Sequence, residues 1–381
     1  MIQIKKAVIY VRNAGGDLKN YNLFTPGPVD IPDDVLEATA HKCIYHREDK
    51  FKILLNEITE MLKKLVDCKH RIYILTSSGT GAMETAYVNI MSRSDLPVVG
   101  ICGKFGERWA ELCKSYGHNP VIIRQDFGRS ISPDMVEDGL KRAKKPAVVF
   151  TTLTETSTGV VNDIKGISEV VKRYDGYLVV DGVAGIGADP FYLDGWGVDV
   201  LVGASQKALM APPGIAFVAA SGRACEKFKT ADTPRYYFDL NLYEKFLEKG
   251  QTPWTPAITI LYGLKKGLQK IMRIGVERNY ERHRRLAEFV RQRFKKLGYE
   301  LFAEKPSNGL TVIKMPQGID STDVIKECKE KFGILFANGQ GELKGKILRV
   351  GHMGNYNIKK LSHALDIFEK VVAKRLRGGK Y

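Results

Sequence analysis

The chain has 381 residues, of which 44% are hydrophobic and 27% charged, and its formal net charge at pH 7 is +16. These proportions are typical of a globular protein with one or two domains, and no apolar run reaches the roughly 18 residues that a membrane span requires. Most lysines and arginines alternate with glutamates along expected helices, and only the C-terminal KRLRGGKY is a concentrated basic run. We therefore expect no nucleic-acid partner, no membrane partner and a cytoplasmic location.

The N-terminal stretch MIQIKKAVIYVRNAGG is interrupted by Arg12 before any cleavage-like site. It predicts an arm or edge strand over residues 1–23 rather than a signal peptide. The six cysteines are scattered without CxxC spacing, which argues against a disulfide framework. His41, Cys43 and His46 lie close together, but their spacing matches no zinc pattern, so we expect no metal site.

Residues 98 to 221 alternate between short apolar runs and amphipathic segments. The runs PVVGICG, PVIIRQ, PAVVFTTL, GYLVVDGVAG and VDVLVGAS are continuously apolar, which indicates strands buried on both faces of a parallel sheet. Segments such as GERWAELCKSYG, SPDMVEDGLKRA and DIKGISEVVKRYDG between them have helical patterns. The alternation predicts an α/β domain with right-handed crossovers, in which ligands bind at the carboxyl ends of the strands.

After GQTPWTPAIT, a long helical stretch is expected from about Ile258 to Leu297, with a break near Gly275. The remainder contains the strand-like runs LTVIKMP, GILFANGQ and KILRVGHMG, with helices between and after them. This pattern predicts a smaller α+β domain. We place the large domain at residues 24–272 and the small C-terminal domain at residues 273–381.

Three motifs at strand ends carry candidate chemistry. In TSSGTGAMETA, small residues from Ser78 open a helix whose free N–H groups suit a phosphate, but no Gly-Lys-Ser/Thr follows and we expect no strand before it. Asp181 ends an apolar strand, and Lys207 is expected to end the next strand but one. Considered separately, Asp181 would be explained as an aspartate that caps a turn, and Lys207 as a lysine whose ammonium group reaches water. Together, the three groups are those that pyridoxal 5'-phosphate requires.

The sequence resembles the class V aminotransferases of fold type I, most of all the alanine–glyoxylate and serine–pyruvate or serine–glyoxylate group. The resemblance rests on FTPGPVDIP, SSGTGAMETA, TETSTGVVNDI, VDGVAGIGADP, GWGVDVLVGASQKALMAPPG and LRVGHMG, which follow the family's order over nearly the whole chain. It implies an α/β fold with a mainly parallel central sheet and a smaller α+β C-terminal domain. It also implies pyridoxal 5'-phosphate as cofactor and transfer of an amino group from alanine or serine to glyoxylate or pyruvate.

Matching the motifs residue by residue implies individual roles. Lys207 would bind the cofactor covalently and later move the Cα proton of the substrate, and Asp181 would pair with the pyridine nitrogen. Arg349 would grip the substrate carboxylate through two parallel hydrogen bonds, and Gly27 would let the backbone approach the substrate. Further cofactor contacts would come from Ser78, Gly79, Thr80 and Gln206 at the phosphate, Phe105 and Val183 on the two ring faces, Thr156 near the phenolic oxygen, and Thr255 from a second subunit.

Two features of these assignments extend or depart from the family pattern. Phe105 stands where relatives often have tryptophan, so the ring contact is kept but the indole N–H donor is lost. The role of Thr255 implies a homodimer with shared active sites.

Alternatives remain open from the sequence. Transamination of phosphoserine, aminoethylphosphonate or aspartate would use the same fold. The positive net charge of the chain would suit a phosphorylated substrate. A cysteine desulfurase would need a reactive cysteine in the C-terminal third, but Cys328 lies in an expected helix beside glutamates, which raise a thiol pKa. A basic nucleic-acid-binding protein would belong to a different class and would hold no coloured cofactor.

Overall fold

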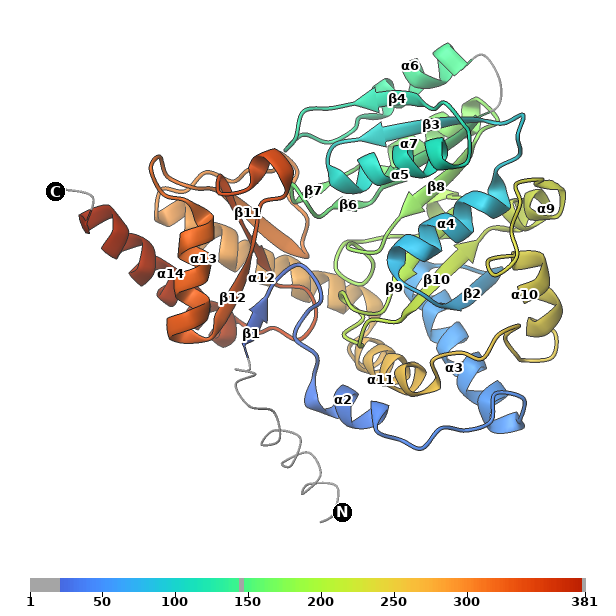
Figure 1. Cartoon of the computed structure of the whole chain (residues 1–381), viewed down its shortest axis with the longest axis horizontal. Helices are drawn as coiled ribbons and strands as arrows, with labels where there is room; N and C mark the ends of the chain where they lie inside the picture. Colours follow the sequence, from blue (N-terminus) through green and yellow to red (C-terminus); the bar gives the residue numbers. More distant parts are fainter. Residues whose placement is uncertain (1–20, 144–146, 379–381) are drawn as a thin grey trace.

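The computed structural model describes residues 21–143 and 147–378 (Figure 1). Most of the expected N-terminal arm, residues 1–20, lies outside the described residues, as do residues 379–381 of the basic tail. None of the helices in the described stretches combines the length and hydropathy that a membrane crossing requires. Two separate sheets organise the rest of the chain.

A seven-stranded sheet forms the centre of the larger part, with the strand order β2-β10-β9-β8-β5-β3-β4. All pairings from β9 to β4 are parallel, whereas β10 is antiparallel to both β9 and β2. The predicted mainly parallel sheet is therefore confirmed. Its strands are β2 (Arg71–Thr76), β3 (Leu96–Ile101), β4 (Val121–Arg124), β5 (Ala147–Thr152), β8 (Tyr177–Asp181), β9 (Val200–Ala204) and β10 (Ile215–Ala220).

Two expectations about these strands were wrong. A strand does precede the SSGTG motif, because β2 ends at Thr76; its short run begins beside charged residues, which concealed it in the sequence. Lys207 does not end the next strand but one after Asp181, because β9 directly follows β8 and Lys207 lies in the turn after β9. The intervening segment contains only a short helix, α8 (Leu193–Trp196).

Helices cover both faces of this sheet. Side chains alternate across each strand, so that Val179 packs into the apolar cluster on one face and Val180 into the cluster on the other. This two-sided burial explains why the strand runs are continuously apolar. One cluster includes α4 (Gly79–Ile90), α5 (Lys104–Ser115), α9 (Gly222–Thr230) and α10 (Leu240–Leu247), and the other includes α3 (Asp49–Val66), α6 (Pro133–Ala143), α7 (Ile164–Arg173) and α11 (Ile258–Ile274).

A second, four-stranded sheet has the order β1-β12-β13-β11 and packs against the C-terminal helices. β13 is antiparallel to β11 and β12, while the N-terminal strand β1 pairs in parallel with β12. The expected break at Gly275 is confirmed, since it separates α11 from α12. The elements are β1 (Asn22–Phe24), β11 (Leu310–Lys314), β12 (Ile334–Asn338) and β13 (Ile347–Gly351), with α12 (Val276–Lys296), α13 (Ser321–Phe332) and α14 (Ile358–Gly378).

Shorter elements complete the described chain. Helix α2 (Asp33–Thr39) packs against α11, and a two-stranded ribbon joins β6 (Thr154–Glu155) to β7 (Val160–Val161). A single 3₁₀ turn, η1 (Gly341–Leu343), precedes β13. The ribbon matters for function because it lies directly after β5, at the carboxyl edge of the central sheet.

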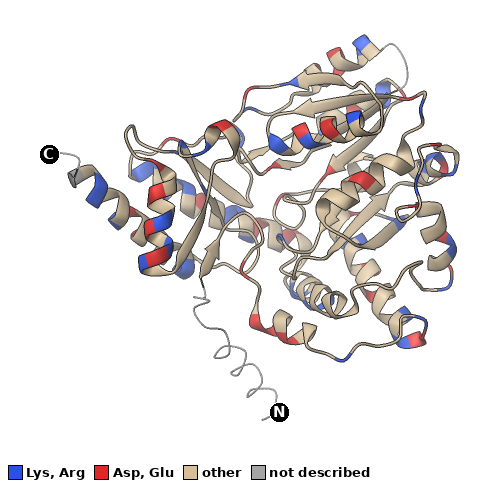
Figure 2. Ribbon diagram, viewed as in Figure 1, with Lys and Arg blue, Asp and Glu red and all other residues tan. Residues whose placement is uncertain are grey.

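Charged residues are dispersed over the outer helices. Figure 2 shows basic and acidic positions interleaved along α5 and α13. Ion pairs such as Arg284–Glu281 and Lys331–Glu327 join residues one helical turn apart. Because exposed pairs of this kind contribute little to stability, they mark solvated helix faces rather than a fold-determining feature.

Candidate active site

Lys207 lies at the carboxyl edge of the seven-stranded sheet, in the turn after β9. Its Nζ donates a hydrogen bond to the carbonyl oxygen of Pro26 at 2.7 Å. The next residue, Gly27, has φ +134°, and a Cβ atom there would lie 2.3 Å from the Lys207 Nζ. Only glycine permits this approach, so the N-terminal loop closes over the amine.

Asp181 ends β8, the neighbouring strand, and is 5% exposed. Its carboxylate accepts a hydrogen bond from the Val183 N–H at 2.9 Å. Burial raises the pKa of Asp181 to about 6, and the positive charge of Lys207 opposes that shift. Burial likewise lowers the pKa of Lys207 to about 8, against the attraction of Asp181. The two groups are therefore close enough to stabilise each other's charged forms.

Helix α4 begins beside these two groups, directly after β2. Ser78 is its N-cap and accepts a hydrogen bond from the Gly81 N–H at 3.3 Å. A Cβ atom on Gly79 would come within 2.9 Å of the Val183 side chain, so the helix start packs against the segment that follows Asp181. The N–H groups of a first helical turn have no partner within the helix, which makes this end suitable for an anion.

Glu155 joins the start of α5 to the loop that carries Thr156. It is fully buried, and its carboxylate accepts hydrogen bonds from the N–H of Phe105 at 3.0 Å and of Gly106 at 3.1 Å. The other carboxylate oxygen accepts the Ser157 hydroxyl at 2.6 Å. Burial raises the pKa of Glu155, while these donors favour its charged form. Sequence reasoning missed Glu155 although it lies inside the quoted TETSTG motif; an acidic residue flanked by threonines in a buried segment was the available signal.

Arg349 reaches the site from the second sheet. It lies in β13 and is 8% exposed. Its Nε donates to the carbonyl oxygen of Asn338 at 2.7 Å, and its Nη1 donates to that of Thr156 at 3.2 Å. Burial lowers the pKa of Arg349 to about 10, and its charge in turn contributes to the low pKa of Lys207. Within the described part of the chain, no carboxylate forms an ion pair with this guanidinium.

Of two further predicted residues, Gln206 lies next to Lys207 and Thr255 lies apart from the groups above. Gln206 precedes Lys207, and its carbonyl oxygen accepts the Val29 N–H at 3.2 Å, which anchors the N-terminal loop. Thr255 is exposed in the loop before α11 and, among the described residues, forms no hydrogen bond with the groups above.

A second residue that sequence reasoning missed is Arg108 on α5. Its Nη1 donates to the Thr80 hydroxyl at 3.0 Å, and its guanidinium lies over the Phe105 ring at 4.7 Å from the centroid. Its spacing of three residues from Phe105 places both on one helix face, which is the signal that the sequence offered.

These residues fit pyridoxal 5'-phosphate. The buried amine of Lys207 has a carbonyl rather than a carboxylate as its hydrogen-bond partner, so it is available to an aldehyde. Asp181 is a buried carboxylate suited to a protonated ring nitrogen. The start of α4 offers free N–H donors to a phosphate, and Phe105 and Val183 are apolar groups of the kind that confine an aromatic ring.

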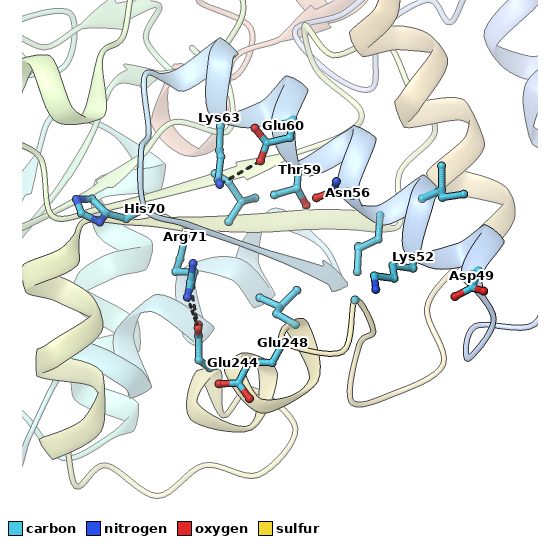
Figure 3. Close-up of a pocket in the computed structure, with 15 residues that line it drawn as sticks. Asp49, Lys52, Asn56, Thr59, Glu60, Lys63, His70, Arg71, Glu244 and Glu248 are labelled. Carbon is cyan, nitrogen blue, oxygen red and sulfur yellow. Dashed lines mark hydrogen bonds and ion pairs between the residues drawn. The ribbon is translucent and has the colours of Figure 1, made fainter.

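A cavity of about 610 Å³ lies elsewhere, between α3, the start of β2 and α10 (Figure 3). None of the predicted site residues lines it. Its charged residues are partly paired with one another, as Arg71 with Glu244 at 2.7 Å and Lys63 with Glu60 at 3.1 Å. The candidate active site is therefore defined by the polar groups at the strand ends and not by this cavity.

Comparison with known proteins identifies a family. The sequence model described as Aminotransferase class-V matches residues 33–359. The chain is 38% identical to a protein named soluble hydrogenase, small subunit, from Synechococcus sp., over 92% of each chain. It is 33% identical to the L-aspartate–glyoxylate aminotransferase of Paracoccus denitrificans, over 87% of this chain and 86% of that one. It is 32% identical to the serine–glyoxylate aminotransferase of Arabidopsis thaliana, over 92% of this chain and 90% of that one.

A solved structure agrees with the sequence relatives. The alanine–glyoxylate aminotransferase from Nostoc sp. superposes with a TM-score of 0.89 at 28% sequence identity. The match covers 94% of this chain and 96% of that chain. The similarity therefore extends over nearly the whole length of both chains.

Proposed function

We propose that this chain, which belongs to the class V aminotransferase family, transfers an amino group from alanine or serine to glyoxylate or pyruvate with pyridoxal 5'-phosphate as cofactor. The observation that carries the proposal is the buried guanidinium of Arg349, which forms no ion pair among the described residues and whose positive charge helps to lower the pKa of Lys207. A buried guanidinium without a carboxylate partner is costly, and a substrate carboxylate removes that cost. The relatives that use serine, alanine or aspartate with glyoxylate support the same class of substrate.

The chain's own residues supply orientation and proton transfer. Bound pyridoxal 5'-phosphate contributes an electrophilic carbon that accepts the amino group and a ring that withdraws electrons from the substrate Cα. Asp181 holds the proton on the ring nitrogen, which sustains that withdrawal. The amine of Lys207 has a pKa of about 8, so near this pH it exchanges a proton readily and can move it from the substrate Cα. Arg349 fixes the substrate carboxylate and so aligns the Cα with Lys207.

A half-reaction screen tests the proposal. The purified holoenzyme should be yellow, and borohydride should bleach the colour and attach the cofactor to the peptide that contains Lys207, which mass spectrometry locates. Alanine or serine alone should convert the absorbance to that of the aminated cofactor, and glyoxylate or pyruvate should restore it. A colourless protein would contradict the function, and so would a spectrum that none of the tested amino acids changes.

Aspartate is a second candidate donor, favoured by the relative that acts on aspartate and glyoxylate. It is included in the same screen. Conversion by aspartate with no response to alanine or serine would move the donor assignment to the dicarboxylic amino acid while leaving the reaction class unchanged.

We further propose that the enzyme is a homodimer in which Thr255 completes the partner's phosphate site. Arg47 supports this idea because it holds the preceding loop through the Gln251 side chain at 2.9 Å and the Thr252 carbonyl at 2.8 Å. An aromatic pair lies at the loop: the exposed Tyr237 stacks on Trp254, with their centroids 5.5 Å apart. Light scattering should give the mass of two chains, and a monomer that retains full activity would refute the shared site.

A further inference from the structure

The Arg108 side chain bridges two helices that carry predicted cofactor contacts. It originates on α5, where its guanidinium covers the Phe105 ring, and ends at the first turn of α4, where it donates to the Thr80 hydroxyl at 3.0 Å. The guanidinium therefore lies between the ring-stacking position and the phosphate-binding helix start.

No carboxylate neutralises Arg108 within the described part of the chain. The neighbouring Glu107 is already paired with Lys104 at 2.7 Å and with Arg124 at 3.3 Å. A guanidinium has five N–H donors, and the contact with Thr80 uses only one. Because arginine binds phosphates and carboxylates best through two parallel hydrogen bonds, Arg108 is positioned for an anion that the protein itself does not supply.

The charge of Arg108 also acts on the reacting groups. Burial is the main influence on the pKa of both Asp181 and Lys207, and the positive charge of Arg108 lowers both values. The guanidinium is thus near enough to affect both groups, while its contact with Thr80 is open to solvent.

We propose that Arg108 is a cofactor-binding residue that grips the phosphate of pyridoxal 5'-phosphate together with the N-terminus of α4. The phosphate carries nearly two negative charges at neutral pH, whereas a helix N-terminus offers only about half a positive charge. None of the phosphate contacts expected from the motifs is a cation; these are Ser78, Gly79, Thr80, Gln206 and, from a second subunit, Thr255. Arg108 supplies the missing full charge. The inference rests on the proposed function for the identity of the cofactor.

The test compares two ligands that differ only in the phosphate. Apoenzyme of the wild type, Arg108→Gln, Arg108→Lys and a control, Arg124→Gln, is titrated with pyridoxal 5'-phosphate and with pyridoxal, and binding is followed by absorbance and tryptophan fluorescence. Losing a charge-assisted contact should weaken binding of the phosphorylated ligand by about 10- to 100-fold in Arg108→Gln. Binding of pyridoxal should be unchanged. Arg108→Lys should recover part of the loss, and the exposed Arg124→Gln should match the wild type.

Each outcome decides the proposal. Equal weakening for both ligands would overturn it, since Arg108 would then act through ring packing. Unchanged affinity for pyridoxal 5'-phosphate with a raised KM for aspartate alone would also overturn it in favour of a distal substrate carboxylate. If Arg108→Gln fails to fold, the Arg108→Lys variant decides. Weaker binding of pyridoxal 5'-phosphate but not of pyridoxal supports the proposal, and unchanged binding of both ligands refutes it. A wild-type apoenzyme that binds no pyridoxal 5'-phosphate would instead defeat the proposed function, and this inference with it.

Discussion

Asp181 ends a strand of the seven-stranded sheet and Lys207 lies in the turn after the neighbouring strand, whereas Arg349 lies inside a strand of the four-stranded sheet. In a parallel sheet, all carboxyl ends meet at one edge, so the last residues of successive strands gather at one place. In the antiparallel part of the second sheet, strand ends alternate between edges, and no single edge collects functional groups. A residue from this sheet reaches the site only where one strand faces the other part of the molecule.

The two regions meet through several contacts, among them the hydrogen bond from the Asn308 N–H to the Asp189 carboxylate and that from the Ser307 N–H to the Gly159 carbonyl oxygen. The hydrogen bond from Arg349 to the Thr156 carbonyl joins β13 to the loop beside the central sheet. In the proposed function, substrate capture by Arg349 would depend on how the two sheets are placed, whereas the proposed cofactor contacts lie mainly on the first sheet. The comparison predicts that variants in the two regions should separate these two properties.

The largest expected effect is that of Arg349→Ala. The loss of a buried, charge-assisted carboxylate contact should raise the KM for the amino acid by about 100-fold, with little change in the affinity for pyridoxal 5'-phosphate. Steady-state kinetics and cofactor titration measure the two quantities. Arg293→Gln is the control, because this arginine pairs with Asp366 and Glu369 away from the site. Equal loss of both properties would make Arg349 a structural residue.

Asp181→Asn should produce an effect of comparable size that depends on pH and acts on stability. The folded pKa of about 6 lies above the ordinary value of 3.8, so the stabilisation from this group is present below pH 3.8 and is lost as pH rises through 6. Asparagine cannot ionise. As the pH rises from 4 to 6, the free energy of unfolding of the apoprotein variant should therefore increase relative to that of the wild type, by up to roughly 3 kcal/mol. Urea unfolding at several pH values measures this gain. The exposed Asp138→Asn should show no such trend, and a pH-independent difference for Asp181→Asn would contradict the buried charge.

The smallest effect is expected for Cys328→Ala in the second region. Cys328 is fully buried in α13, and burial, with a contribution from Glu327, raises the pKa of its thiol to about 12. A protonated, inaccessible thiol cannot act as a nucleophile. Transaminase activity should therefore be retained, with a stability loss of only about 1 kcal/mol from the small cavity. Activity assays and melting curves measure these two properties. Release of sulfide from free cysteine by the wild type but not by Cys328→Ala would support the desulfurase alternative.

Much of the central region could be predicted from local pattern. Continuous valine and isoleucine runs indicated β5, β8 and β9, and the motifs around Asp181 and Lys207 indicated their chemistry. The strand before Ser78 was missed because β2 begins at Arg71, next to other charged residues, and its pairing partner, β10, is distant in sequence. Glu155 and Arg108 were missed because their roles depend on contacts with other elements rather than on their own neighbours in the chain.

The sequence by itself determined the alternating α/β pattern, the break at Gly275 and the residue types that the cofactor requires, because each depends on short-range periodicity or on a local motif. Only the tertiary structure decided that β1 joins the C-terminal sheet, that Gly27 lies against Lys207 and that Arg349 and Arg108 converge on the site without carboxylate partners among the described residues. Three of these relations join segments more than a hundred residues apart, and the fourth joins helix α5 to helix α4. Burial and charge at these contacts depend on the folded chain as a whole.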